Sequence, residues 1–454
     1  MRRDRVCRFL CDNERPLTLF ATKNRHDADI LELSIPALAG LAADPLVSLV
    51  DTAFVGQLGP TPLAALGVNA SIFSMAFVIF NFLAYGTTPR VGRAVGDDDM
   101  AKAGRVVIQA LTLAIVAGLL ALAAIELAAG PILTVMGATG EMREPALTYL
   151  RIRALAGPAV LLISAGRGSF RGYQDTRTPM VVTIGLNIVN LILDPLLIFG
   201  LGWGLAGAAI ATATAQWCGA LGFVFLLLVN RREELGIEIA APDPGELLGF
   251  LRIGWEMFMR TAALVGTMTL ATAVAARIGV VAVAAHQVAN QLWLFLALVV
   301  DALAVSGQAL VSKHLGRDDP TEARAVADRL LQWGIALGVL LALGFAALRP
   351  WLPGWFSDDP ETVAAVLDIF IFVALLQPLN GLVFVWDGIF MGAEAFSFLA
   401  KAMFLSALAA AAVLLLVRPM GWGLTGVWWG ITTLMLTRIA TLAIPYYRRW
   451  ILDD

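Results

Sequence analysis

Two acidic residues lie in apolar stretches where an ionised carboxylate is costly. Asp44 stands near the middle of the run from Ser34 to Gly56, and Asp194 lies in a second apolar run. On insertion scales, an acid at the centre of a bilayer costs roughly 2.5–3.5 kcal/mol. Carboxyl groups that are buried or close together hold a proton more tightly than in water. The two residues predict a site that holds a proton near neutral pH and releases it when water enters; the structural alternative is an acid paired with a neighbouring helix.

A polar stripe leads to Asp194. Asn190 and Asn187 precede it by four and seven residues, and Thr183 extends the stripe by one more turn. These spacings place the side chains on one helix face. A polar face on an apolar helix is expected to line a cavity, so we expect Asp44 and Asp194 to face each other. The alternative is that the amides only join helices to one another.

Pro36 and Pro45 flank the first acid. Each proline removes an N–H donor and kinks a helix, and a broken span that carries a buried acid is a pointer to a transporter site. We therefore predict that the first span is a hinge. Asp51, seven residues after Asp44, lies near the outer end of this span, where an interfacial cap competes with a coupling role.

The second half of the chain carries a different set of charges. Glu256 and Arg260 stand four residues apart, and Asp387 lies in a later apolar run. An isolated arginine at this depth is costly, so we predict that Arg260 pairs with Asp387 or with Glu256, as a structural or gating lock.

Several further side chains could line a substrate cavity. The second span carries a stripe of aromatic and polar residues, which either lines the cavity or only packs against neighbouring helices. Two amide residues outside this span are further candidates. The candidates are Phe73, Phe77, Asn81, Tyr85, Asn187 and Gln287.

The composition indicates an all-α polytopic membrane protein. Of 454 residues, 59% are hydrophobic and 15% charged, and the mean hydropathy is +0.79. Repeated apolar runs of about 20 residues each suit membrane helices. We predict twelve spans, at 30–57, 64–90, 105–128, 145–166, 178–200, 204–229, 248–277, 283–312, 324–348, 362–388, 396–417 and 422–446.

Basic residues fall mainly on one side of this layout. The segments on the side of the N-terminus hold 24 of the 32 Lys and Arg residues, and the opposite side holds four. The expected location is the cell membrane (plasma or inner), and the positive-inside rule then places both termini on its cytoplasmic side.

The chain repeats itself at an offset of about 220 residues. Gly168 and Gly172 recur as Gly388 and Gly392, and an acidic turn after Gly96 recurs after Gly316. We expect those turns to be helix N-caps. The repeat predicts two pseudo-symmetric six-helix lobes around a central cavity. The expected divisions are a disordered cytoplasmic tail at 1–28, lobes at 29–229 and 248–448, and a linker at 230–247.

Three motifs resemble a known family. They are Leu-Val-Asp-Thr-Ala-Phe-Val-Gly at the end of span 1, Asn190-Leu-Ile-Leu-Asp194-Pro in span 5, and Asp387-Gly-Ile-Phe-Met-Gly-Ala in span 10. Together with the architecture they are similar to the multidrug and toxic compound extrusion (MATE) family, DinF-type branch. The resemblance implies a cation site made by Asp44, Asp194 and Asn190, and Thr212 matches a further polar contributor.

The resemblance also implies an antiporter that exports drugs or toxic cations as H⁺ or Na⁺ enters. No cofactor, resident metal, enzyme activity or nucleic-acid partner is expected; the expected partners are a small organic solute and membrane lipid, with a monomeric state. Two alternatives keep the fold, namely an exporter of citrate-like organic anions and a lipid flippase.

Overall fold

The computed structural model describes residues 24–239, 241–356 and 358–448. Helices are the regular secondary structure of these ranges. Residues 1–23 of the expected disordered tail lie outside them, so that part of the prediction stays untested.

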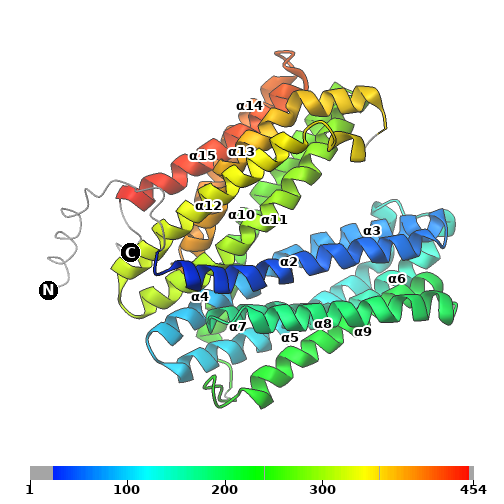
Figure 1. Cartoon of the computed structure of the whole chain (residues 1–454). Helices are drawn as coiled ribbons and strands as arrows, with labels where there is room; N and C mark the ends of the chain where they lie inside the picture. Colours follow the sequence, from blue (N-terminus) through cyan, green and yellow to red (C-terminus); the bar gives the residue numbers. More distant parts are fainter. Residues whose placement is uncertain (1–23, 240, 357, 449–454) are drawn as a thin grey trace.

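The first half of the chain forms one group of helices (Figure 1). In chain order these are α2 (Asp27–Gly56), α3 (Pro60–Val78), η1 (Ile79–Asn81), α4 (Phe82–Gly96), α5 (Met100–Val135), η2 (Gly140–Met142), α6 (Arg143–Ala154), α7 (Gly157–Gly172), α8 (Arg177–Pro195), η3 (Leu196–Gly200), α9 (Gly204–Phe225) and η4 (Leu226–Asn230).

The second half forms another group, which lies above the first in Figure 1. Its elements are α10 (Pro244–Ile278), α11 (Val280–Gly316), α12 (Pro320–Leu348), η5 (Pro353–Trp355), α13 (Pro360–Gly392), α14 (Phe396–Val417) and α15 (Gly423–Arg448). These two groups are called the N-lobe and the C-lobe below.

The predicted spans are present. In the described part of the chain, eleven helices are long and apolar enough to cross a membrane, and the pair Gly140–Ala154 and Gly157–Gly172, bent by 45°, makes a twelfth. Many of the helices run a few residues beyond the predicted spans. The all-α polytopic fold predicted from composition is therefore confirmed. Pro36 and Pro45 both lie inside α2, whose helix continues from Asp27 to Gly56.

Acidic side chains start the matched helices in the two lobes, as predicted. Asp99 accepts a hydrogen bond from the backbone N–H of Lys102 (2.8 Å), and Asp319 accepts one from that of Glu322 (3.0 Å). Each carboxylate satisfies a donor that the first turn leaves free. The same device therefore begins α5 and α12.

Small residues hold equivalent helices together in both lobes. A Cβ on Gly168 would lie 2.8 Å from the carbonyl oxygen of Ala84, and one on Gly388 would lie 2.2 Å from that of Ala304. These two contacts are related by the offset of 220 residues. The sequence repeat therefore corresponds to equivalent helix–helix contacts in the two lobes.

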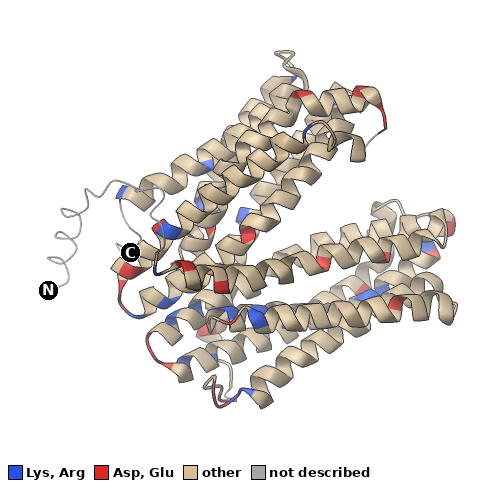
Figure 2. Ribbon diagram, viewed as in Figure 1, with Lys and Arg blue, Asp and Glu red and all other residues tan. Residues whose placement is uncertain are grey.

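The two lobes touch near the end of the molecule where the described chain begins, and their helices diverge from there (Figure 1). The hydroxyl of Ser34 on α2 lies 2.6 Å from that of Ser306 on α11. The side-chain amide of Gln308 donates to the carbonyl oxygen of Tyr85 at 2.7 Å. Lys and Arg gather towards the same end, while the middle parts of most helices carry few charges (Figure 2).

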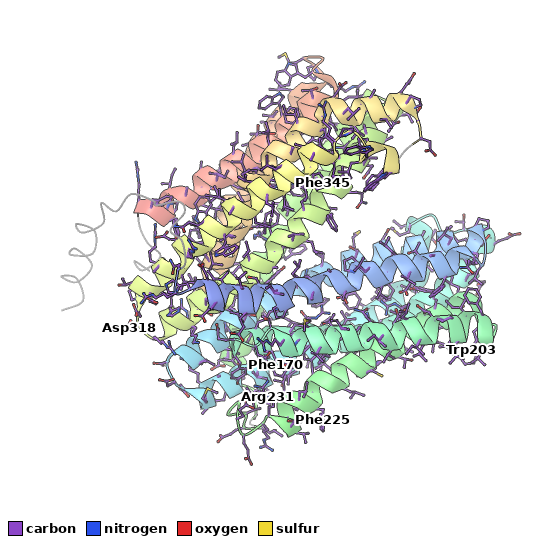
Figure 3. All side chains as sticks on the ribbon, viewed as in Figure 1. Phe170, Trp203, Phe225, Arg231, Asp318 and Phe345 are labelled. Atoms are coloured by element: carbon purple, nitrogen blue, oxygen red, sulfur yellow. The ribbon has the colours of Figure 1, made fainter. Side chains whose placement is uncertain are left out.

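Aromatic side chains mark the core of each lobe and the far end of the molecule (Figure 3). Phe170 packs against Phe223 in the N-lobe, with ring centroids 6.0 Å apart, and Phe345 stacks on Phe370 in the C-lobe at 6.2 Å. Trp203, at the turn between η3 and α9, is half exposed. Tryptophan in such a position is typical of a membrane–water interface.

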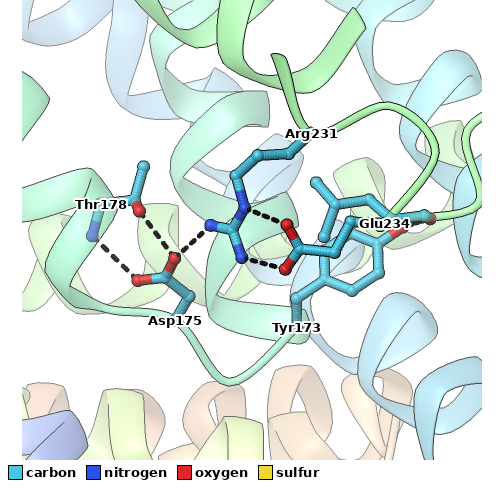
Figure 4. A network of polar contacts seen from close by, with 6 residues as sticks. Tyr173, Asp175, Thr178, Arg231 and Glu234 are labelled. Carbon is cyan, nitrogen blue, oxygen red and sulfur yellow. Dashed lines mark hydrogen bonds and ion pairs between the residues drawn. The ribbon is translucent and has the colours of Figure 1, made fainter.

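A polar network ties the segment after η4 to the turn between α7 and α8 (Figure 4). Arg231 donates to Asp175 (2.8 Å) and to Glu234, and the hydroxyl of Tyr173 donates to the carbonyl oxygen of Leu235 (2.7 Å). Thr178 donates to Asp175 from its backbone and from its hydroxyl. The start of the inter-lobe linker is therefore fixed to the N-lobe.

Candidate functional site

A cavity of about 400 Å³ lies inside the N-lobe, between α2, α3, α6, α7, α8 and α9. Its size suits a drug-sized ligand. The polar and charged residues of its wall are Asp44, Ser48, Asp51, Thr52, Asn81, Tyr149, Arg153, Ser164, Arg167, Asn187, Asn190, Thr212 and Gln216.

The polar stripe on α8 faces the interior, as predicted. Thr183, Asn187, Asn190 and Asp194 are 1%, 8%, 3% and 0% exposed. Proline at position 195 ends the regular α-helix directly after Asp194, and a π-helical turn follows. The carboxyl group therefore stands at the end of α8 with no access to lipid or bulk water.

Asp51 is the acid next to Asp194. The two carboxyl groups lie close to each other, and the side chain of Asn190 also lies close to Asp194. However, neither oxygen of Asp194 nor Oδ1 of Asp51 accepts a hydrogen bond of normal geometry among the described residues. Both observations hold together because two ionised carboxylates only accept hydrogen bonds. The contact becomes a hydrogen bond when one of the two carries a proton.

Asp44 lies elsewhere, contrary to the expectation that it faces Asp194. Its carboxylate accepts hydrogen bonds from Arg167 (3.0 Å) and Asn187 (2.9 Å), and 45% of its side chain is exposed. The reason is the register of two helices that start on the same side. Gly40 packs on Met180, so Asp44 reaches the level of Asn187, and Asp51 reaches that of Asp194.

Two other residues complete the surroundings of the acid pair. The amide of Asn190 donates to the hydroxyl of Thr212 at 3.4 Å, and that hydroxyl donates to the carbonyl oxygen of Ala208 at 2.9 Å. Asn190 and Thr212 thus lie side by side on the cavity wall.

The aromatic stripe divides in the structure. Phe73 and Asn81 line the cavity, and Phe77 stacks on Phe73 with ring centroids 5.7 Å apart. Tyr85 lies outside the cavity wall and contacts the C-lobe through its carbonyl oxygen. Gln287 is exposed on α11 in the other lobe.

The C-lobe holds the predicted ion pair. Arg260 donates to Asp387 at 2.5 Å, and Arg438 on α15 donates to the same carboxylate oxygen. Glu256 pairs instead with Arg252 (3.4 Å). The second arginine was not predicted as a partner, although a basic residue inside a span is itself a signal that it needs one. Arg153 and Arg167, which line the cavity, were not predicted as site residues either. Arg153 lies inside a predicted span and carries the same signal, whereas Arg167 lies one residue beyond the end of that span.

A family model described as MatE matches residues 36–196 and 257–416. Protein DETOXIFICATION 44, chloroplastic, of Arabidopsis thaliana is 35% identical over 424 residues, which are 90% of this chain and 80% of that protein. DNA damage-inducible protein F of Escherichia coli (strain K12) is 26% identical over 445 residues, 96% of this chain and 95% of that protein. A MATE protein solved in the bent conformation has the same fold, with a TM-score of 0.87 at 22% identity over 94% of this chain and 96% of that chain.

Proposed function

Since the chain belongs to the MatE family, and is therefore a membrane transporter and not an enzyme, we propose that it exports an organic solute in exchange for an inward-moving cation. The proposed coupling site is the acid pair Asp51–Asp194, with Asn190 and Thr212 beside it. The single observation that carries this proposal is the fully buried Asp194, which accepts no hydrogen bond among the described residues and lies against Asp51, a residue of the cavity wall.

The pair exchanges a cation because its charge is costly where it lies. A buried ionised carboxylate without a donor is strongly unfavourable. One proton between the two groups supplies the missing donor, and a second removes the remaining charge. Loss of charge weakens the hold of the pair on a bound cationic solute. The pair therefore accepts a cation from one side and a solute from the other in turn.

Movement of α2 is the proposed link between this exchange and transport. Asp51 lies on α2 beyond Pro45, and proline leaves the backbone ladder incomplete. A change in the attraction between Asp51 and α8 then bends α2 and shrinks the cavity. Each charge that enters down about 100 mV contributes about 2.3 kcal/mol, roughly a 50-fold gradient of solute.

The proposed orientation places both termini in the cytoplasm. Lys and Arg gather at the end where the lobes touch (Figure 2), and basic loops remain on the cytoplasmic side. In this orientation the lobes are closed towards the cytoplasm and diverge towards the outside.

Efflux from proteoliposomes tests the coupling pair. With ethidium as the probe and an imposed pH or sodium gradient, we expect Asp51→Asn and Asp194→Asn each to abolish gradient-driven efflux. Asp44→Asn is expected to retain most of it, because Asp44 is partly exposed and paired with Arg167. Asp368→Asn, at an exposed acid of α13, is the matched control. Normal coupled efflux in Asp194→Asn would refute the assignment.

A second candidate is export of an organic anion. It is favoured by Arg153 and Arg167, whose guanidinium groups lie on the cavity wall. Competition separates the two candidates: an anion exporter is inhibited by citrate and not by ethidium, and a cation exporter shows the reverse.

A further inference from the structure

The carboxylate of Asp27, the first residue of α2, is held by two side chains of α12 (Figure 1). Arg329 donates to its two oxygens from Nε at 2.7 Å and from Nη2 at 2.8 Å, and the indole N–H of Trp333 donates at 2.9 Å. The backbone N–H of Asn24 adds a further hydrogen bond at 2.9 Å. Asp27, Arg329 and Trp333 are called the clasp below. Because α2 belongs to the N-lobe and α12 to the C-lobe, the clasp joins the two lobes.

Two properties make the clasp a stronger link than an ordinary surface ion pair. The guanidinium of Arg329 binds both carboxylate oxygens, and bidentate charged hydrogen bonds are among the strong ones in proteins. The side chains of Asp27 and Arg329 are also only 18% and 11% exposed. Arg93 and Glu394 form another ion pair between the lobes, at 3.2 Å, but their side chains are 40% and 29% exposed. Water and salt therefore weaken the clasp less than they weaken that pair.

The repeat provides no counterpart of the clasp in the other half of the interface. The offset of 220 residues places Leu247, on α10, at the position equivalent to Asp27. It places Gln109, on α5, at the position equivalent to Arg329. Neither side chain carries a charge, so α10 and α5 cannot form the same ion pair. The clasp therefore holds the closed end on the side of α2 alone.

We propose that the clasp keeps the cytoplasmic end shut, and that its release on the side of α2 is a required step in exposing the cavity to the cytoplasm. This inference rests on the proposed function, from which it takes the orientation and the need for alternating exposure. With the lobes together, Asp27 and Arg329 neutralise each other away from water. With the lobes apart, water solvates each charge. Loss of one partner leaves an unpaired, shielded charge in the closed state only, and so favours the open state.

The reaction of a buried cysteine with N-ethylmaleimide tests this role on the purified full-length protein. Ser306 is buried at the closed end, with its hydroxyl oxygen 2.6 Å from that of Ser34 across the lobe boundary. The reporter is Ser306→Cys in a chain whose three native cysteines are replaced by serine. Asp27→Asn is expected to raise the reaction rate of the reporter at least about tenfold, equivalent to about 1.4 kcal/mol. Arg329→Gln should raise it by a similar factor.

Two comparisons make the result specific to the clasp. Glu32→Gln breaks the ion pair of Glu32 with Arg177 (3.0 Å), which starts from the same helix but lies within the N-lobe, and it should leave the rate unchanged. The double variant Asp27→Asn with Arg329→Gln should react no faster than the faster of the two single variants. The reason is that both substitutions remove the same interaction, and their effects then do not add.

Reaction rates of Asp27→Asn and Arg329→Gln equal to that of the reporter alone would overturn this role of the clasp. A double variant in which the two effects multiply would overturn it as well. The measurement needs neither an ion gradient nor a solute. Its failure is therefore distinguishable from failure of the proposed exchange, which is judged by efflux in the Asp51 and Asp194 variants.

Discussion

Asp387 is a buried carboxylate shared by two arginines from different helices. The side chains of Asp387, Arg260 and Arg438 are 7%, 12% and 2% exposed. Without this carboxylate, the two guanidinium groups would lose their only direct ion pairs among the described residues, and the more distant Asp301 would be the acid left near them. The main role of Asp387 is therefore to neutralise the buried charge of the two arginines. The three residues also join α10, α13 and α15.

Asp387→Asn is expected to lower stability strongly. Removal of one partner from a buried ion pair typically costs about 3–5 kcal/mol. Thermal unfolding of the purified protein measures the loss. Arg252→Gln, which breaks the exposed pair with Glu256, is the control and should cost less than about 1 kcal/mol. An unchanged unfolding temperature in Asp387→Asn would contradict a structural lock.

For single residues, the sequence predicts which side chains belong to a site better than it predicts which of those side chains contact each other. Asp194 and Asn190 are recognisable from their spacing, and the pair Arg260–Asp387 from the need of each charge for a partner. The partner of Asp194 is not recognisable, because it depends on how α2 slides along α8. A shift of two helical turns exchanges Asp44 for Asp51 without a change in either hydrophobic pattern.

Between the lobes, helices α4 and α11 cross at two glycines that are equivalent in the repeat. A Cβ on Gly96 would lie 2.0 Å from the carbonyl oxygen of Lys313, and a Cβ on Gly316 would lie 2.1 Å from that of Arg93. The backbones approach so closely that neither glycine tolerates a side chain there. This crossing sets the distance between the lobes at their closed end.

Gly96→Val is therefore expected to separate α4 from α11. An overfilled contact typically costs about 1–3 kcal/mol, so the closed arrangement should become at least about tenfold less populated. The readout is the maleimide reaction rate of a cysteine at the buried Ser306, which should rise by a similar factor. Gly67→Ala, where an added Cβ meets nothing within 4 Å, should leave the rate unchanged. An unaltered rate in Gly96→Val would show that the crossing does not control closure.

The network that anchors the linker depends on the charge of Asp175. Burial works to raise the pKa of its carboxyl group, but hydrogen bonds from Thr178 and Arg231 outweigh burial and lower the pKa below its ordinary value. A group whose pKa is lower in the folded protein adds stability above its unfolded pKa of about 3.9 and loses it as the pH falls further. The network is thus intact at neutral pH.

Asp175→Asn should consequently lower the unfolding temperature at neutral pH, with a cost of about 1–3 kcal/mol for the lost charged hydrogen bonds. The difference from the wild type should shrink as the pH falls below about 3.9, since protonation removes the same charge from the wild type. Unfolding temperatures of both proteins across this range measure it. A difference that stayed constant with pH would mean that the charge of Asp175 is not what matters.

Helices and their caps follow well from sequence, because apolar length and acidic first turns are local properties. The twelve spans and the caps at Asp99 and Asp319 belong to this class. The bend between α6 and α7 does not, since it depends on packing by neighbouring helices. Likewise, the sequence of the linker segment at 231–237 does not predict that it is attached to the N-lobe, because the ion pair between Arg231 and Asp175 joins segments that are far apart in the chain.

The two lobes share a framework and differ in charge. Arg167 and Asp387 are equivalent in the repeat, and each pairs with the first helix of its own lobe. The polarity is reversed, because Arg167 binds Asp44 on α2 whereas Asp387 binds Arg260 on α10. The acid pair Asp51–Asp194 lies beside the cavity of the N-lobe. The repeat thus predicts the arrangement of helices in both lobes. The difference in charge between the lobes comes from single residues that differ at equivalent positions of the repeat.

Alternating exposure of the cavity requires the lobes to part where they now touch. Ser34 on α2 and Ser306 on α11 meet there, buried, with their hydroxyl oxygens 2.6 Å apart. Side chains whose terminal atoms touch in this way are near enough for a disulfide to be tried at the two positions; such a bond needs Cβ atoms about 3.5–4.5 Å apart. A covalent bond at this point would hold the closed end shut.

In a chain with Cys7, Cys11 and Cys218 replaced by serine, we expect Ser34→Cys with Ser306→Cys to form a disulfide on oxidation. Gradient-driven efflux of ethidium should then fall at least about tenfold, which needs only about 1.4 kcal/mol of bias. Reduction should restore it, because the lobes are free to separate again. Each single cysteine variant, treated with the same oxidant, should transport normally. If the oxidised double variant formed the bond and still exported at the full rate, the lobes would not need to part between α2 and α11, and transport would have to proceed within the N-lobe alone.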